Sequence, residues 1–324
     1  MAGKYVLGFD VGGTKVGIGL ASPDGKILGS AFLPNKDTHP DDVLPQMLAS
    51  ARKLLADAGL AEGDLAAFGI SAPFPADPIN GILTAPTNNP KWRNVPIRKY
   101  FEDNLHIPGT FENDANCAAL AEWLFGAGRG TENMIFLTMS TGIGAGIVAG
   151  GQLVRGKSFY AGEVGHMILV PGGRRCSCGL RGCYEAYCGG RAAAMAIQEE
   201  IKDQPDHPML AFADGKVENV DMIAIEKAVR AGNEYALAIW DDMARKNAQA
   251  IGILMQTFNP EKIVLGTFGW AIGDLYMDPI RNYLKDYVWD QMAKDCQIVA
   301  GELKREIGAY AGAAAALYFL KEQR

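Results

Sequence analysis

The chain has 324 residues, of which 48% are hydrophobic and 21% are charged, so it is long enough for two domains with apolar cores. The formal net charge of -6 disfavours nucleic acid as a partner, because nucleic-acid binding needs basic surface that neutralises phosphates. The N-terminal residues lack the apolar segment of a signal peptide, and no later run approaches the roughly 20 apolar residues of a membrane span. We therefore expect a cytoplasmic protein with no membrane partner.

The opening run KYVLGFDVGGTKVGIGLAS predicts two β-strands joined by a tight turn at Gly12, Gly13 and Thr14. Residues 134–154 repeat this order of an apolar strand, a turn rich in Gly and Thr, and a second apolar strand. The repeat predicts two domains built on one plan.

Hydrophobic periodicity predicts an alternation of helices and strands through the rest of the chain, which is typical of an α/β protein. In chain order the predicted elements are a helix at 41–59, a strand at 65–73, a loop at 73–96, a strand-to-helix segment at 110–128, a helix at 247–260, a strand at 261–266 and a helix at 307–323.

The turn DVGGTK at residues 10–15 has the chemistry to bind phosphate, although it lacks the spacing of a Walker loop. Its glycines let backbone N–H groups approach phosphate oxygens, Thr14 and Lys15 add donors and charge, and Asp10 can help to place a magnesium ion. An ordinary glycine hairpin explains this turn equally well when it is read alone. The second turn, STGIGAG at residues 140–146, favours phosphate, because two such turns facing one cleft can hold a polyphosphate from both sides.

The segment ENDAN at residues 112–116 places Asp114 where a predicted strand meets a predicted helix. Asn and Asp commonly cap helices at such a junction. A carboxylate there is also well placed to act as the base for a hydroxyl nucleophile. Glu163 and Glu185 are suited to accept hydrogen bonds from sugar hydroxyls, and surface salt bridges are the alternative for each of them.

Residues 162–185 combine one histidine and three cysteines with the spacing H-x9-C-x-C-x4-C. One imidazole and three thiolates make a closed tetrahedral set for a structural Zn2+, because no position is left for a catalytic water. A loop of free thiols is the alternative, and the C-x-C step is shorter than the usual spacing of zinc ligands. The predicted ligands are His166, Cys176, Cys178 and Cys183. The other cysteines, Cys117, Cys188 and Cys296, stand singly and are expected to be buried, inert thiols.

Four segments together resemble the ROK family, which comprises sugar kinases, glucokinases among them, and related sugar-responsive repressors. They are DVGGTK, ENDAN, STGIGAG, and GEVGH followed by CSCGLRGCYE. The resemblance covers nearly the whole chain and implies a two-domain α/β fold of the actin-like, hexokinase type (ribonuclease H-like), with a central cleft. It implies a smaller domain at 1–117 plus 305–324 and a larger domain at 118–304. The larger domain carries the zinc loop, which is the segment of residues 166–183 that contains the four predicted ligands.

The resemblance implies ATP-dependent phosphorylation of a hexose hydroxyl, with glucose to glucose 6-phosphate as the leading reaction and Mg2+ accompanying ATP. Asp114 matches the catalytic base, and the structural zinc is expected to order the sugar-binding loop. The implied sugar-binding residues are Asn88, Asn113, Asp114, Glu163, His166 and Glu185. The implied nucleotide-binding residues are Asp10, Gly12, Gly13, Thr14, Lys15, Thr141, Gly142, Gly144 and Gly266.

Two segments depart from the family pattern and leave alternatives open. Phe74 stands where related chains often have a glycine, and the strand end IVLGTFGWA lacks the usual Gly-Gly turn. The acceptor can therefore be fructose, N-acetylmannosamine or N-acetylglucosamine, and the donor can be polyphosphate. A non-catalytic sugar-responsive regulator is the alternative of another class, and the lack of room for a helix-turn-helix segment before Asp10 disfavours a repressor. The resemblance also implies a homodimer or homotetramer.

Overall fold

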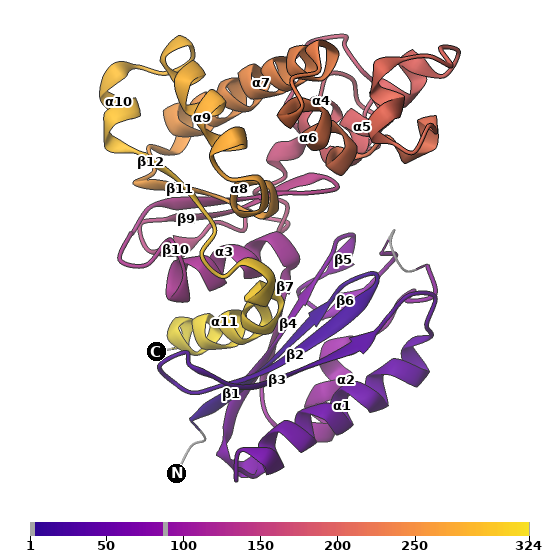
Figure 1. Cartoon of the computed structure of the whole chain (residues 1–324). Coiled ribbons are helices and arrows are strands. Elements are labelled where there is room, and N and C mark those ends of the chain that lie inside the picture. The colour runs from indigo at the N-terminus through magenta and orange to yellow at the C-terminus, as the bar shows by residue number, and fades with distance from the viewer. Residues whose placement is uncertain (1–3, 87–89, 324) are drawn as a thin grey trace. The chain divides into compact units, whose positions relative to one another are not determined.

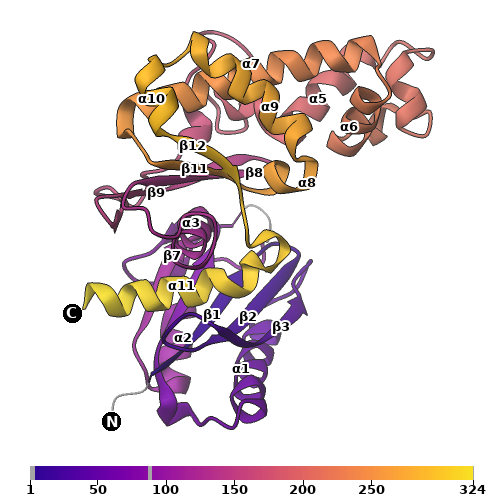
Figure 2. The same cartoon turned by 60° about the vertical axis from the view of Figure 1, so that its left-hand side comes forward.

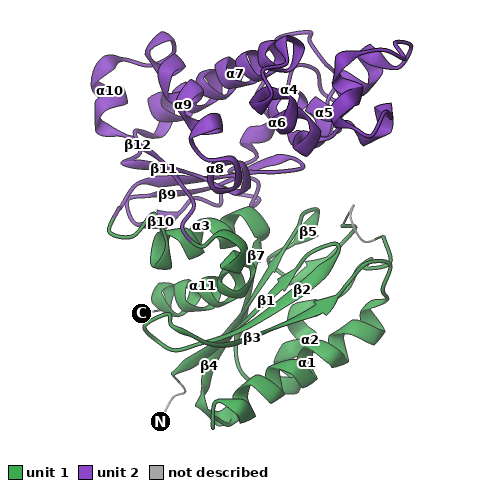
Figure 3. Ribbon diagram, viewed as in Figure 1, with its two compact units in different colours: residues 1–130, 303–324 green, residues 131–302 purple. Residues whose placement is uncertain are grey.

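The computed structural model describes residues 4–86 and 90–323, so the predicted sugar-binding residue Asn88 lies outside the described residues. The chain forms two compact units (Figure 3). Unit 1 comprises residues 1–130 and 303–324, and unit 2 comprises residues 131–302. The predicted domain boundary after residue 117 falls inside a helix of unit 1.

Unit 1 is built on a sheet with the strand order β3-β2-β1-β4-β7 (Figure 1). The first three strands of this order pair antiparallel, and β1, β4 and β7 pair parallel. The predicted tight turn is confirmed, because β1 and β2 form a hairpin around Gly12 and Gly13. The strands are β1 (Tyr5–Val11), β2 (Lys15–Ala21), β3 (Ile27–Pro34), β4 (Leu65–Ala72) and β7 (Gly109–Asn113).

Helices cover both faces of this sheet (Figure 1). α11 packs on β1, β4 and α3, whereas α1 packs on β2 and β3 and α2 packs on β7. The helices of unit 1 are α1 (Pro40–Asp57), α2 (Ile97–Leu105), α3 (Asp114–Phe125) and α11 (Ile307–Glu322), with short 3-10 turns η1 (Glu62–Asp64) and η6 (Lys304–Glu306).

The small residues of α11 explain how closely this helix approaches the sheet (Figure 2). A Cβ atom added at Gly8 in β1 would lie 2.2 Å from the backbone nitrogen of Ala313. A Cβ atom added at Gly69 in β4 would lie 2.2 Å from the carbonyl oxygen of Gly312. Glycines on the strands and small residues on the helix therefore let the two backbones come into contact. The alanine-rich sequence of α11 alone does not predict this contact.

The segment predicted as a loop at residues 73–96 contains regular structure. β5 (Ala76–Asp77) and β6 (Ile82–Leu83) form a short antiparallel hairpin, and Leu83 also pairs with Val95. Leu83 and Trp92 are fully buried against the core of unit 1. The prediction of a loop was wrong for this hairpin, because two-residue strands carry too few residues to show a period.

Unit 2 repeats the plan of unit 1 with the strand order β10-β9-β8-β11-β12. Again the first three strands pair antiparallel and the last three pair parallel. The prediction of two domains built on one plan is therefore confirmed. The strands are β8 (Met134–Met139), β9 (Ile143–Ala149), β10 (Gln152–Leu153), β11 (Lys262–Leu265) and β12 (Gln297–Ala300).

The long helix α7 organises the helical layer of unit 2, because it packs against α4, α6 and α9. It begins after Asn233, whose side chain accepts a hydrogen bond from the backbone of Ala236, and it ends at Asn259 in the left-handed conformation. No helix in the described part of the chain is long and apolar enough to cross a membrane. The helices of unit 2 are α4 (Glu185–Cys188), α5 (Gly190–Ile201), α6 (Met222–Arg230), α7 (Glu234–Phe258), α8 (Thr267–Ile272), α9 (Asp274–Tyr283) and α10 (Asp290–Asp295), with 3-10 turns η2 (Val164–His166), η3 (Pro208–Phe212), η4 (Val217–Asn219) and η5 (Leu284–Asp286).

Candidate functional site

The glycine turn between β1 and β2 is braced by Asn35, a residue that the sequence did not single out. The Asn35 side-chain amide donates to the carbonyl oxygen of Gly12 at 2.7 Å, and its backbone N–H donates to the carbonyl oxygen of Thr14 at 2.8 Å. Asn35 is 1% exposed. Lys15 packs its ammonium over the Phe32 ring, 4.9 Å from the centroid. The residue that follows β3 thus fixes the conformation of the predicted nucleotide-binding turn, because the pairing of β2 with β3 places Asn35 next to that turn.

Asp10 lies at the end of β1 beside Ser71 of the parallel strand β4. The Ser71 hydroxyl donates to Asp10 Oδ1 at 2.6 Å. Burial raises the pKa of Asp10 to about 6, the Ser71 hydrogen bond and Lys15 oppose this rise, and the charge of Asp114 adds to it. The parallel pairing of β4 with both β1 and β7 brings Asp10 and Asp114 to the same edge of the sheet of unit 1, where the charge of Asp114 acts on Asp10.

Asn113, not Asp114, caps α3. The Asn113 side-chain oxygen accepts hydrogen bonds from the backbone N–H groups of Ala115 at 2.9 Å and Asn116 at 3.3 Å. Asp114 Oδ1 also accepts from the Ala115 N–H, at 2.8 Å. Asp114 reaches the surface of unit 1, and partial loss of hydration around its carboxylate raises its pKa. The helix-capping alternative thus applies to Asn113, and Asp114 is available for chemistry.

The four predicted zinc ligands come together in unit 2. Their ligand atoms all lie within 4.8 Å of one another. Cys176 Sγ lies 3.7 Å from His166 Nδ1, and Cys178 Sγ lies 3.7 Å from Cys183 Sγ. A tetrahedral zinc with Zn–S bonds of about 2.3 Å places neighbouring sulfurs about 3.8 Å apart. The donor set and these separations fit a structural Zn2+.

The backbone of the cysteine loop forms a small hairpin around these ligands. Arg175 and Arg181 form an antiparallel bridge, and the Cys176 N–H donates to the carbonyl oxygen of Leu180 at 2.9 Å. Gly182 has φ +84°, and a Cβ atom there would lie 1.9 Å from the carbonyl oxygen of Val170. The hairpin therefore needs a glycine next to the predicted ligand Cys183, because a larger residue at Gly182 would clash with the backbone of Val170.

The turn of residues 140–146 joins β8 to β9 and packs against the segment GEVGH. The Ala145 N–H donates to the carbonyl oxygen of Gly162 at 3.0 Å. A Cβ atom at Gly165 would lie 2.1 Å from the carbonyl oxygen of Ile143. Glu163 precedes η2 and is exposed. The structure thus brings the second glycine turn and the predicted sugar-binding segment of unit 2 into direct contact.

A pocket of about 580 Å³ opens in unit 2 beside this turn. Its volume is in the range of small-molecule binding sites. Gly266, the predicted nucleotide-binding residue after β11, adjoins Phe268 of the pocket wall, and the Gly266 N–H donates to the carbonyl oxygen of Leu137 at 2.8 Å. The lining residues are Ser140, Thr141, Gly190, Arg191, Ala194, Met195, Gln198, Val220, Asp221, Met222, Ile223 and Phe268.

Most of this pocket was not predicted, because its walls come from α5, the start of α6 and α8, which are distant in the sequence. Met195 and Ile223 are large, exposed apolar side chains on its wall. Such exposed apolar residues at a pocket are a structural signal for a ligand with an apolar face. A single sequence does not distinguish them from surface residues of amphipathic helices.

Comparison with known proteins identifies the family. Residues 6–320 match the ROK family. The chain belongs to the ROK family. The predicted family and the predicted hexokinase-type α/β fold are therefore confirmed.

Several ROK proteins resemble this chain along nearly their whole length. A glucokinase from Thermotoga maritima is 32% identical and aligns over 94% of this chain and 94% of its own. A crystal structure of a ROK hexokinase from Thermus thermophilus has a TM-score of 0.83 and 30% identity, and covers 98% of this chain and 99% of its own. A ROK glucokinase from Streptomyces griseus, solved in complex with glucose and AMPPNP, has a TM-score of 0.75 and 30% identity over 96% of this chain and 98% of its own.

The relatives of this chain also include a regulator. A xylose repressor from Caldicellulosiruptor bescii is 28% identical over 92% of this chain, which corresponds to 74% of the repressor. Membership of the ROK family therefore leaves two classes of function, sugar kinase and sugar-responsive repressor, to be separated by the chemistry of the site.

Proposed function

We propose that this chain is an ATP-dependent hexose kinase whose leading substrate is glucose. The observation that carries the proposal is Asp10, which lies next to the β1–β2 glycine turn and whose pKa the charge of Asp114 helps to raise, in a chain that aligns over 94% of its length with a glucokinase. A repressor needs to bind a sugar but does not need a base. The acids Asp10 and Asp114, together with a glycine turn suited to bind phosphate, therefore favour the kinase over the regulator.

Asp114 acts as the general base in the proposed reaction. Its carboxylate takes the proton of the sugar 6-hydroxyl while that oxygen attacks the γ-phosphorus of ATP, the bond from the γ-phosphorus to the bridging oxygen breaks, and ADP leaves. A raised pKa brings Asp114 nearer to neutral pH, where a base both accepts a proton well and stays ionised.

Asp10 and the β1–β2 glycine turn bind the phosphates of ATP in unit 1. Residues 12–15 contribute backbone N–H groups, the Thr14 hydroxyl and the Lys15 charge, and Asp10 contributes a carboxylate for Mg2+. Bound Mg2+ would neutralise charge that develops on the phosphate oxygens during transfer. The second turn, with Thr141, Gly142 and Gly144, provides the corresponding backbone in unit 2.

The 580 Å³ pocket of unit 2 is proposed to hold the nucleoside of ATP. Met195, Met222 and Phe268 offer apolar surface to the base, and Ser140 and Thr141 stand at the turn where the phosphates begin. Gly266 lets the chain turn closely at the end of β11.

The sugar is proposed to bind through Asn113, Asp114, Glu163, His166 and Glu185, with Asn88 from the segment outside the described residues. His166 would use Nδ1, which faces Cys176, for zinc and Nε2 for the sugar or its neighbours. The zinc ligands would thereby fix the loop between Glu163 and Glu185. A cytoplasmic location and a homodimeric or homotetrameric state remain predictions.

A coupled ADP-release assay on zinc-containing protein with ATP and Mg2+ tests this function across a panel of hexoses and N-acetylhexosamines. Strong turnover on glucose supports the leading assignment, and preference for fructose, N-acetylmannosamine or N-acetylglucosamine reassigns the substrate but keeps the mechanism. If no hexose is phosphorylated with ATP or with polyphosphate, but titration calorimetry shows that a sugar binds, the result would instead support a non-catalytic regulator.

A further inference from the structure

Glu185 makes two hydrogen bonds within the protein, in addition to its proposed contact with the sugar. Its Oε2 accepts a hydrogen bond from the backbone N–H of Ile143 in the β8–β9 turn, at 2.9 Å. Its Oε1 accepts a hydrogen bond from the Ser177 hydroxyl, at 3.3 Å. Ser177 lies between the zinc ligands Cys176 and Cys178. One carboxylate thus connects the zinc loop to the second glycine turn.

The glycine turn is shaped to receive this carboxylate. A Cβ atom at Gly142 would lie 2.5 Å from Glu185 Oε2, which is closer than a carbon and an oxygen can approach. A larger residue at position 142 would therefore displace the Glu185 carboxylate from its place beside the turn. The hydrogen bond to an ionised acceptor is of the stronger, charge-assisted kind.

The same turn is docked on the junction that follows α4. The Gly190 N–H donates to the carbonyl oxygen of Ser140 at 2.8 Å, and the Arg191 N–H donates to the carbonyl oxygen of Thr141 at 3.1 Å. Ser140 and Thr141 also line the proposed nucleoside pocket. A displacement of Glu185 and α4 would therefore move the backbone that faces the nucleotide.

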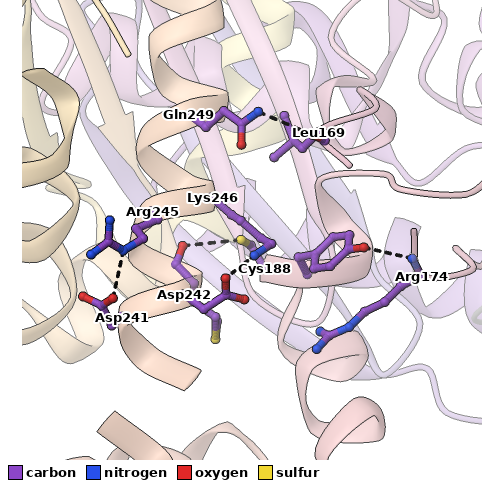
Figure 4. Close-up of polar contacts among 10 residues, drawn as sticks. Leu169, Arg174, Cys188, Asp241, Asp242, Arg245, Lys246 and Gln249 are labelled. Atoms are coloured by element: carbon purple, nitrogen blue, oxygen red, sulfur yellow. Dashed lines mark hydrogen bonds and ion pairs between the residues drawn. The ribbon is translucent and has the colours of Figure 1, made fainter. Parts of the chain in front are cut away.

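α4 is itself held firmly on α7, beside the zinc loop. The Tyr184 hydroxyl donates to Asn247 Oδ1 at 2.6 Å, and the Cys188 thiol donates to the carbonyl oxygen of Met243 at 3.6 Å. Figure 4 shows this contact of Cys188 together with the zinc-loop residue Arg174, whose backbone N–H donates to the Tyr187 hydroxyl at 2.9 Å. The zinc loop, α4 and the turn thus form one connected group in unit 2.

We propose that Glu185 is a positioning residue through which the zinc loop sets the conformation of the nucleotide-side turn. Zinc would then support nucleotide binding in the absence of sugar, in addition to the proposed contact of Glu185 with the sugar. This inference rests on the proposed kinase function, because it takes the turn at residues 140–146 to contact the donor.

The test is titration calorimetry of Mg-AMPPNP into zinc-loaded protein without sugar, for the wild type and for Glu185→Ala, Glu185→Gln and Ser177→Ala. We expect Glu185→Ala to weaken nucleotide binding about tenfold, which corresponds to the loss of one charge-assisted hydrogen bond. Glu185→Gln keeps an acceptor for the Ile143 N–H and is expected to retain most of the affinity. Ser177→Ala removes one contact and is expected to have a smaller effect. Removal of zinc by a chelator should weaken nucleotide binding in the wild type at least as much as Glu185→Ala does.

The matched control is Glu199→Ala, which removes an exposed carboxylate of α5 that pairs with Lys202. It should leave nucleotide affinity unchanged. Zinc content and the thermal midpoint of each variant confirm that it is folded and loaded. A simple charge effect has the opposite sign, because loss of a negative group near a polyphosphate would strengthen nucleotide binding.

The outcomes separate this inference from the proposed function. Unchanged or stronger nucleotide binding in Glu185→Ala and in the zinc-free wild type would overturn the positioning role while leaving the kinase in place. A wild-type protein that binds no Mg-AMPPNP would instead count against both the kinase and this inference.

Discussion

The Ser71 hydroxyl donates a hydrogen bond to Asp10 across two neighbouring parallel strands, at 2.6 Å from Oδ1. This bond favours the ionised form of Asp10, whereas burial raises its pKa from the ordinary 3.8 to about 6. The proposed reaction needs Asp10 and Asp114 to be ionised, so activity should be lost as the pH falls through their raised pKa values. The free energy of unfolding changes in the opposite direction. Because the pKa of Asp10 is higher in the folded than in the unfolded state, protonated Asp10 stabilises the fold at low pH, and this stabilisation is lost as the pH rises from 3.8 to about 6.

Ser71→Ala should move the acidic limb of the kcat/KM profile to higher pH, because the hydrogen bond that lowers the Asp10 pKa is gone. We expect a shift of about 0.5 to 1 pH unit, as for one hydrogen bond of about 1 kcal/mol. The limb reports the interacting pair of acids rather than either one alone. Ser22→Ala is the control, since Ser22 pairs with the exposed Asp24. An acidic limb that stays in place in Ser71→Ala would show that Asp10 does not govern it.

Asp114→Asn should leave the fold intact and reduce kcat by at least about a hundredfold, which is the usual range for removal of a general base. The substitution keeps an acceptor for the Ala115 N–H, and the cap of α3 depends on Asn113. Steady-state kinetics, zinc content and thermal midpoint measure the three properties separately. Turnover close to that of the wild type would remove Asp114 from the role of base.

Cys178→Ser should lower zinc content and reduce the thermal midpoint by about 5–10 °C, because a structural zinc contributes directly to folding. Cys178 is the exposed member of the set, so its substitution disturbs the packing least. Cys296→Ser changes a thiol outside the ligand set and should keep the metal. Equal zinc content in the two variants would contradict the assigned ligands.

Glu122→Ala should destabilise unit 1 by about 2–4 kcal/mol, because it leaves two backbone N–H donors without their side-chain acceptor. Glu122 is 0% exposed, and its carboxylate accepts from the backbone N–H groups of Ala127 at 2.8 Å and Leu303 at 3.0 Å. The urea midpoint measures the effect. Glu102→Ala, which breaks a surface pair with Arg98, should change it little. Similar midpoints for both variants would show that the Glu122 contacts contribute little.

Local patterns in the sequence predicted the β1–β2 turn, the helix after Asn113 and the cysteine ligands, because each depends on residues that are close together in the chain. The contacts of Asn35 with the turn depend on the pairing of β2 with β3, and the 580 Å³ pocket of unit 2 depends on the packing of α5, α6 and α8. Such contacts between distant segments leave no periodic signal. The two hydrogen bonds of Glu185 belong to this group, so the sequence suggested a sugar ligand or a surface salt bridge at this position and did not predict these contacts.

Phosphorus NMR of the products formed from glucose and Mg-ATP, with wild-type protein and with Asp114→Asn, tests the proposed reaction directly. We expect the wild type to form glucose 6-phosphate and ADP in equal amounts and the variant to form almost none. Release of inorganic phosphate alone, or no consumption of ATP with any hexose, would contradict the assignment as a sugar kinase.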